Sequence, residues 1–136
     1  MLAVLWRRPW FLVVLVAADL VADLLSLGLR QWIGRLRPPF VYPLPKALVH
    51  VPHTGAFPSG HASVAFACAV VIARASPRLA GPAFLLAAAI AFSRVYVGVH
   101  WPLDVLGGAA LGMLVSIALL TLAEVRRLSL REPRPG

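Results

Sequence analysis

Four apolar stretches, each about as long as a bilayer is thick, dominate the sequence. They cover roughly Trp10 to Leu29, Ser59 to Pro77, Pro82 to Val99 and Leu103 to Val125. A membrane-spanning helix needs about 20 mostly apolar residues, within a range of about 17 to 25. Hydrophobic residues make up 60% of the 136 residues and charged residues 13%, which is more apolar surface than a soluble domain of this size can bury. The sequence therefore predicts an all-α integral membrane bundle of four transmembrane helices, with residues 1–136 forming one membrane-embedded domain.

The net charge of +8 would suggest a nucleic-acid partner in a soluble chain. We expect no nucleic-acid binding here, because no basic stripe with interleaved aromatic residues is present. The arginines instead cluster at the ends of apolar stretches, as Arg7 and Arg8, Arg74 and Arg78, and then Arg126, Arg127, Arg131 and Arg134. Four crossings place these groups on one side, which the positive-inside rule makes cytoplasmic. The sequence thus predicts a multi-pass protein of the plasma membrane, with residues 30–57 and 93–104 on the non-cytoplasmic face.

That outer face carries cations that the topology rule does not explain. They are Arg30, Arg35, Arg37, Lys46 and Arg94. Anion binding is the simplest reason for placing positive charge there. For Arg35 and Lys46 we prefer a simpler interpretation, in which each side chain anchors the chain among lipid headgroups.

Three short motifs fall on the same face. They are "RQWIGRLRP" with Arg30 and Arg37, "PSGH" at residues 58–61, and a set made of Ser93, Arg94, His100 and Asp104. In this order and at these helix edges, they resemble the signature of the type 2 phosphatidic-acid phosphatase superfamily. That superfamily includes membrane lipid-phosphate phosphatases, bacterial acid phosphatases and vanadium haloperoxidases. The resemblance covers about Leu29 to Leu106 directly, and a haloperoxidase is disfavoured because those relatives are soluble.

The resemblance makes His100 the nucleophile that attacks phosphorus and forms a phosphohistidine. Asp104 follows four residues later, so a carboxylate oxygen can hold one ring N–H if the two share a helix face. That bond would fix the tautomer and stabilise the charge on the phosphorylated ring. The alternative is that His100 merely begins a helix at the headgroups beside Trp101 and Pro102.

The "PSGH" motif should lie at the first turn of a helix, where unpaired N–H groups and the helix dipole favour an anion. Ser59 and the Gly60 amide can then bind phosphate oxygens, while His61 protonates the leaving group and later activates water. Ser59 as a simple N-cap, with His61 as an interfacial residue, is the competing interpretation. Arg30, Arg37 and Arg94 would complete a cationic cage for the phosphate.

The chain departs from the family pattern in two ways. Arg30 stands where the family usually has lysine, and the four apolar stretches correspond to the last four of six helices. With two helices apparently absent, we expect self-association or pairing with another membrane protein.

The remaining polar residues are less informative. Asp19 and Asp23 lie four apart in the first helix, and we expect a buried pair well below the catalytic face. His50 and His53 have the spacing of metal ligands, but no third ligand is evident. We therefore expect no metal and no cofactor.

Together these features predict a metal-independent phosphatase acting on a lipid phosphate or diphosphate. Candidate substrates implied by the resemblance include polyprenyl diphosphates, phosphatidic acid and phosphatidylglycerol phosphate. The alternatives are a non-catalytic lipid-phosphate-binding or scaffold subunit, and a truncated fragment.

Overall fold

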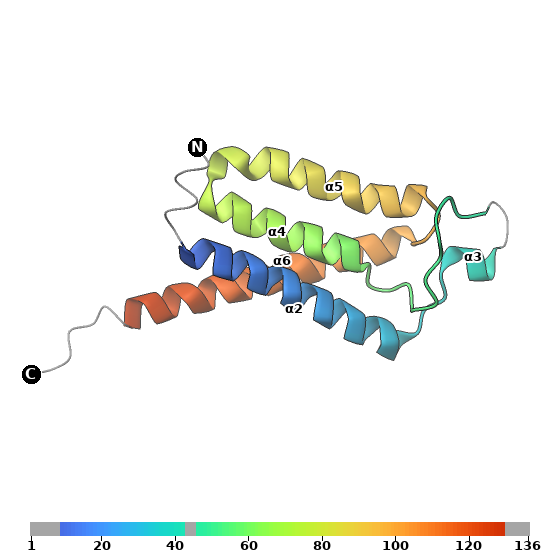
Figure 1. The fold of residues 1–136 in the computed structure, drawn as a ribbon, viewed down its shortest axis with the longest axis horizontal. Helices are drawn as coiled ribbons and strands as arrows, with labels where there is room; N and C mark the ends of the chain where they lie inside the picture. Colours follow the sequence, from blue (N-terminus) through green and yellow to red (C-terminus); the bar gives the residue numbers. More distant parts are fainter. Residues whose placement is uncertain (1–8, 43–45, 130–136) are drawn as a thin grey trace, which may run out of the picture.

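The computed structural model describes residues 9–42 and 46–129, and within these ranges it contains helices but no strand. The elements are α2 (Pro9–Ile33), α3 (Pro38–Val41), α4 (Gly60–Ala75), the 3-10 helix η1 (Pro77–Leu79), α5 (Ala80–Tyr96) and α6 (Pro102–Ser129). The four long helices lie roughly side by side, and successive ones run in opposite directions (Figure 1). The all-α prediction is confirmed. Four of the arginines used to orient the chain, Arg7, Arg8, Arg131 and Arg134, lie outside the described residues.

Three helical segments are long and apolar enough to span a bilayer: Trp10–Val41, Pro77–Tyr96 and Pro102–Arg126. The remaining long helix, α4, has 16 residues and so extends about 24 Å, against a hydrocarbon thickness of about 30 Å. The predicted helical membrane bundle is confirmed, with three helices that are long enough to span and one shorter apolar helix, α4. α4 packs against α2, α5 and α6, which cover part of its surface. Figure 1 shows α4 beginning short of the adjacent ends of α5 and α6, so its first turn is recessed.

Local sequence explains where the helices end. At the end of α2, Gly34 adopts a φ of +63° and its N–H bonds the Arg30 carbonyl, a left-handed termination that favours glycine. At the end of α4, Pro77 disfavours helical backbone at Ser76, which is extended. At the start of α6, Pro102 is the first helical residue and thus sacrifices no helical hydrogen bond.

The closest helix contact is between α4 and α6, where glycines let the backbones meet. A Cβ added to Gly108 would overlap the Ser59 carbonyl oxygen, and one added to Gly112 would overlap the Ser63 carbonyl oxygen. Small residues spaced in this way allow close helix packing in membranes. The buried Ser116 hydroxyl donates to the Ala67 carbonyl 2.9 Å away, which adds a hydrogen bond across the same interface.

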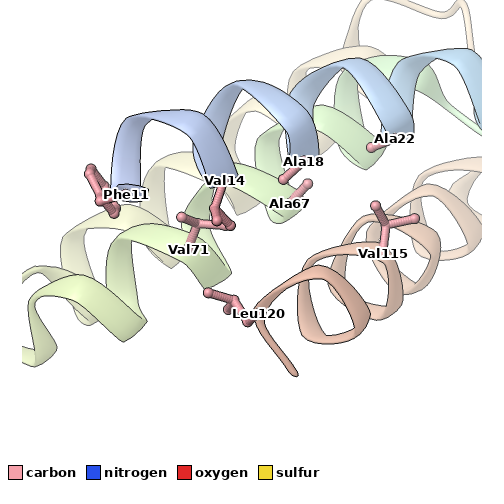
Figure 2. Close-up of a cluster of buried hydrophobic side chains, with 8 residues drawn as sticks. All are labelled: Phe11, Val14, Ala18, Ala22, Ala67, Val71, Val115 and Leu120. Carbon is pink, nitrogen blue, oxygen red and sulfur yellow. The ribbon is translucent and has the colours of Figure 1, made fainter. Parts of the chain in front are cut away.

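A cluster of buried apolar side chains joins α2, α4 and α6 away from the polar end of the bundle. Its members are Phe11, Val14, Ala18, Ala22, Ala67, Val71, Val115 and Leu120 (Figure 2). Several are alanines, so the helices approach closely and van der Waals packing holds them together.

The glycine contact predicts a large effect for a small substitution. Gly112→Ala should destabilise the bundle by about 1 to 3 kcal/mol, because the new methyl group must push α4 away. Gly81→Ala is the matched control, since no atom lies within 4 Å of the added Cβ and alanine favours the helix. Thermal unfolding of both variants in the same detergent tests this. Equal midpoints for the two variants would contradict the close-contact interpretation.

Candidate active site

The residues that the sequence singled out come together at one end of the bundle. Arg30 lies at the end of α2 and Arg94 at the end of α5; Ser59, Gly60 and His61 lie at the start of α4; His100 and Asp104 flank the start of α6; and Arg37 precedes α3. The antiparallel order of the four long helices accounts for this, because it brings the three motifs to the same face.

His100 is almost fully buried, at 4% exposure. Its Nε2 lies 3.1 Å from NH1 of Arg37. A guanidinium can only donate, so Nε2 must present its lone pair and the ring proton must lie on Nδ1. Burial, with the Arg37 charge next, lowers the pKa of His100 from 6.5 to about 4. His100 is therefore neutral at physiological pH, with a lone pair on Nε2.

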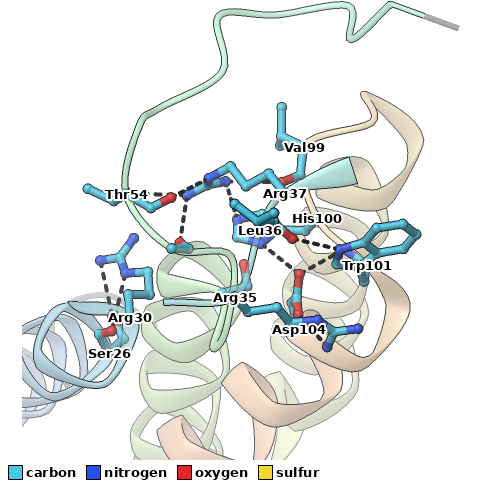
Figure 3. A network of polar contacts seen from close by, with 12 residues as sticks. Ser26, Arg30, Arg35, Leu36, Arg37, Thr54, Val99, His100, Trp101 and Asp104 are labelled. Carbon is cyan, nitrogen blue, oxygen red and sulfur yellow. Dashed lines mark hydrogen bonds and ion pairs between the residues drawn. The ribbon is translucent and has the colours of Figure 1, made fainter. Parts of the chain in front are cut away.

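Arg37 is also buried, at 2% exposure, and its guanidinium ties several segments together (Figure 3). Nε donates to the Thr54 carbonyl at 3.0 Å, NH1 to the Val99 carbonyl at 3.0 Å, and NH2 to the Gly55 carbonyl at 3.2 Å. NH2 also donates to the Thr54 hydroxyl at 3.3 Å. A fixed positive charge thus faces Nε2 of His100.

Asp104 holds the turn that carries His100. Its Oδ2 accepts the Trp101 backbone N–H at 2.8 Å and lies 3.5 Å from Nδ1 of His100. The Trp101 bond is the reciprocal half of a capping box, with Trp101 as the N-cap of α6. The Asp104 carbonyl accepts the Ser59 N–H at 2.9 Å, which joins this turn to the start of α4.

The first turn of α4 meets the end of α2. Ser59 is the N-cap by position, but its hydroxyl makes no capping bond and is buried without a hydrogen-bond partner among the described residues. A Cβ added to Gly60 would lie 3.2 Å from both terminal nitrogens of Arg30. Arg30 itself bonds Ser26, with Nε 3.2 Å from the carbonyl oxygen. The site therefore combines a helix N-terminus, a guanidinium and an unsatisfied hydroxyl, all of which suit an anion.

His61 and Arg94 stand apart from the buried group. His61 is exposed, yet it lies near enough to Arg94, Arg30 and Arg37 for their charges to act on its ring. Arg94 donates from Nε to the Ser93 hydroxyl at 3.1 Å. Within the described chain, neither residue hydrogen-bonds His100, Asp104 or Arg37.

Two cavities adjoin these residues. A polar cavity of about 560 Å³ is lined by Arg30, Arg35, Arg37, His53 and Thr54, among others. An apolar groove of about 470 Å³ lies between α2, α4 and α5, and follows α4 from Gly60 and His61 to Ile72. We call these the polar cavity and the apolar groove.

Two expectations for individual residues are wrong. Asp23 is not buried, since its side chain is 59% exposed, lines the apolar groove and lies 3.9 Å from Arg30. Arg30 extends back along α2, as helical side chains do, and so brings its charge toward Asp23. Arg35 is not a headgroup anchor, because its NH1 bonds the buried Asp104 carboxylate at 3.0 Å.

Sequence reasoning also missed Thr54 and Gly55, which bind Arg37 through a segment without regular structure. No sequence signal marks a carbonyl acceptor in such a segment. The structure adds no third metal ligand beside His50 and His53. Within the described ranges, no cluster of three or more histidine, cysteine or acidic residues occurs.

The fold and the grouped residues define a class: a helical membrane bundle with a buried histidine and several arginines gathered at one end. The chain belongs to the PAP2 superfamily, whose profile matches residues 10–128. It is 36% identical over 106 residues to an undecaprenyl-diphosphatase of Sulfolobus acidocaldarius, covering 76% of this chain and 51% of that protein. It is 35% identical over 121 residues to phosphatidylglycerophosphatase B of Bacillus subtilis, covering 81% of this chain and 57% of that protein.

The fold is similar to the crystal structure of LpxE from Aquifex aeolicus, with a TM-score of 0.75 and 27% identity. That match covers 88% of this chain and 73% of the LpxE chain. The chain thus spans about half the length of the two curated relatives.

Proposed function

We propose that the protein is a metal-independent membrane phosphatase that hydrolyses a lipid phosphate or diphosphate through a phosphohistidine on His100. The observation that carries the proposal is the environment of that ring. His100 is buried and neutral, Nε2 faces a fixed guanidinium, and Nδ1 faces the Asp104 carboxylate. A neutral imidazole oriented in this way is a competent nucleophile.

In the first step, Nε2 of His100 attacks phosphorus and the bond from phosphorus to the lipid oxygen breaks. Arg37 must exchange its contact with Nε2 for one with a phosphate oxygen, since the phosphorus has to approach the same lone pair. Arg30, Arg94, Ser59 and the Gly60 amide supply further donors for the equatorial oxygens. Asp104 balances the positive charge that develops on the ring.

His61 completes both steps as acid and then base. Protonated His61 gives its proton to the departing lipid oxygen, and neutral His61 then takes one from water. The water oxygen bonds phosphorus, the N–P bond breaks, and inorganic phosphate leaves. The position of His61 supports this role, because it lies where the apolar groove meets the start of α4.

The apolar groove supports a substrate with a hydrocarbon chain. Its α4 side runs from His61 to Ile72, about 16 Å at 1.5 Å per residue. A chain in the groove would hold its phosphate next to His61 and Gly60. By their names, the relatives act on undecaprenyl diphosphate and phosphatidylglycerol phosphate, and we propose the same broad class here, together with phosphatidic acid.

Phosphate release from a panel of these lipids by the purified chain tests the proposal. We expect release that persists in EDTA and is inhibited by vanadate, which resembles the trigonal-bipyramidal phosphoryl centre. Activity lost in EDTA and restored by Mg²⁺ would contradict the metal-free mechanism. Binding of lipid phosphate without any release would support the non-catalytic alternative.

We further propose that the protein resides in the plasma membrane with its active site on the non-cytoplasmic face. The arginines at the opposite end of the bundle support this orientation, and Arg74 and Arg78 lie there in the described chain. Cysteines introduced at Arg78 and His53 in a Cys68→Ala background can be probed with an impermeant thiol reagent on intact cells. Labelling at residue 78 but not at residue 53 would show the opposite orientation and contradict the proposal.

Self-association, or pairing with another membrane protein, is a further proposal. The exposed carboxylate of Asp23 supports it, because a charge on a spanning helix is costly when it faces lipid. Light scattering in gentle detergent provides the test. A strictly monomeric and fully active protein would refute it.

The lowered pKa of His100 predicts how the reaction depends on pH. Since the folded value is about 4, the ring stays neutral and nucleophilic down to about pH 5. Its contribution to stability is complete above the unfolded value of about 6.5 and is lost as pH falls toward 4, because only the unfolded ring binds a proton in that interval. We therefore expect phosphoenzyme formation from a substrate with a good leaving group to hold steady from pH 7 to about 5. Single-turnover rates, with unfolding midpoints at each pH, test this, and a fall centred at pH 6.5 in folded protein would contradict it.

A further inference from the structure

Asp104 is completely buried, at 0% exposure, and its two oxygens have different partners (Figure 3). Oδ1 accepts from NH1 of Arg35 at 3.0 Å. Oδ2 accepts from the Trp101 N–H at 2.8 Å and is the oxygen nearest Nδ1 of His100. In the described chain, Arg35 is the only arginine or lysine within 4 Å of this carboxylate. The Trp101 N–H and the more distant charge of Arg37 also favour the ionised carboxylate, but Arg35 is the cation in direct contact with it.

Arg35 is itself held by its surroundings. Its guanidinium carbon lies over the Trp101 ring, 5.8 Å from the ring centre, within the range of a cation–π contact. Its backbone carbonyl accepts the Ala56 N–H at 2.7 Å. The indole N–H of Trp101 donates to the neighbouring Leu36 carbonyl at 3.0 Å. The segment before α3 therefore contacts the turn before α6 twice, through the Arg35 side chain and through the Leu36 carbonyl.

We propose that Arg35 is a positioning residue for the phosphohistidine reaction: it keeps Asp104 ionised and turned toward His100 without binding phosphate itself. This inference rests on the proposed function. The different partners of the two carboxylate oxygens support the proposal. Arg35 binds Oδ1, and Oδ2 is thereby left to face Nδ1 of His100. Arg35 also borders the polar cavity with Arg30 and Arg37, so direct phosphate binding is the competing role.

A split between turnover and affinity separates the two roles. If Arg35 acts through Asp104, Arg35→Gln should lower kcat by about 10- to 100-fold, the range seen when supporting partners of functional histidines are removed. KM should change by less than about threefold, because no substrate contact is lost. The acid limb of the pH profile should also move to higher pH, since an unpaired buried carboxylate binds a proton more readily.

Three further variants make the comparison specific. Arg35→Lys retains a charge and should recover part of kcat. Lys46→Gln removes an exposed charge from the same end of the bundle and should leave kcat and KM unchanged. In an Asp104→Asn background, Arg35→Gln should cause little additional loss, because the two side chains act as one unit. That double variant also avoids the folding cost of a buried carboxylate without its cation. A rise in KM with unchanged kcat, or full additivity with Asp104→Asn, would overturn the inference.

A second measurement needs no turnover. Nitrogen-15 NMR of labelled histidine reports which nitrogen of His100 carries the proton, with the resonance assigned by its loss in His100→Ala. Wild type should show the Nδ1–H form. In Arg35→Gln the Nδ1 resonance should shift, because the carboxylate that Nδ1 faces loses its cation, while Arg37 still holds the lone pair of Nε2. An unchanged His100 signal in folded Arg35→Gln would overturn the inference. If the signal shifts but wild type releases no phosphate, only the proposed function fails.

Discussion

Replacing His100 by alanine should abolish both phosphate release and any acid-labile phosphoenzyme. No other described imidazole is buried against Arg37 and Asp104, so no side chain is placed to take over the attack. We expect a loss of roughly 10⁴-fold or more, the scale on which removing a nucleophile acts in other covalent enzymes. Single-turnover kinetics with a radiolabelled lipid phosphate and rapid quenching measure both quantities.

His50→Ala is the control, since His50 is an exposed histidine at the same end of the bundle and lines neither cavity. It should keep wild-type rates. Wild-type phosphate release by folded His100→Ala would show that the mechanism is wrong.

His61→Ala should fail in a different way. General acid–base assistance is typically worth about 10² to 10⁴-fold, and we expect a loss of that size on lipids with poor leaving groups. A good leaving group needs little protonation, so phosphoenzyme should still form. Its hydrolysis should then slow for want of a base, and the phosphorylated protein should accumulate. The same quenched reactions, run with substrates of graded leaving-group pKa, give the comparison.

If His61→Ala lowers the rate equally for every substrate and no phosphoenzyme accumulates, His61 is not the general acid and base. A binding role would then be the better account, given that His61 lies at the mouth of the apolar groove.

The grouping of the three motifs could be predicted, because the family resemblance singled them out and four antiparallel helices bring them to the same end of the bundle. His100 lies just before Trp101, the N-cap of α6, so the capping turn and not the helix itself brings Nδ1 to 3.5 Å from Asp104. Arg35 could not be assigned in this way, because its partner lies 69 residues away and the contact depends on how an irregular segment folds.

In the fold, too, features set by local sequence could be predicted, and features set by tertiary packing could not. Apolar length and composition predicted the helices, but α2 runs on to Ile33 because its stop signal is Gly34. The buried pair proposed for Asp19 and Asp23 was wrong for Asp23, since hydrophobicity alone does not reveal which helix face lacks a neighbour. Here Asp23 faces the apolar groove and Arg30.

The glycine contact between α4 and α6 has a mechanical consequence. Bilayers differ in thickness, and helix bundles adjust to them mainly by tilting. The helices that carry His61 and His100 meet through backbone atoms at Gly108 and Gly112, so they tilt together as one stiff body. By contrast, α5 is the least buried of the three candidate spans and packs mainly on α4, so it can absorb such changes. We therefore expect the spacing of the two histidines to change little with lipid composition. The Arg94 carbonyl accepts the Val99 N–H at 3.2 Å beside His100, so α5 should tilt mainly at its opposite end.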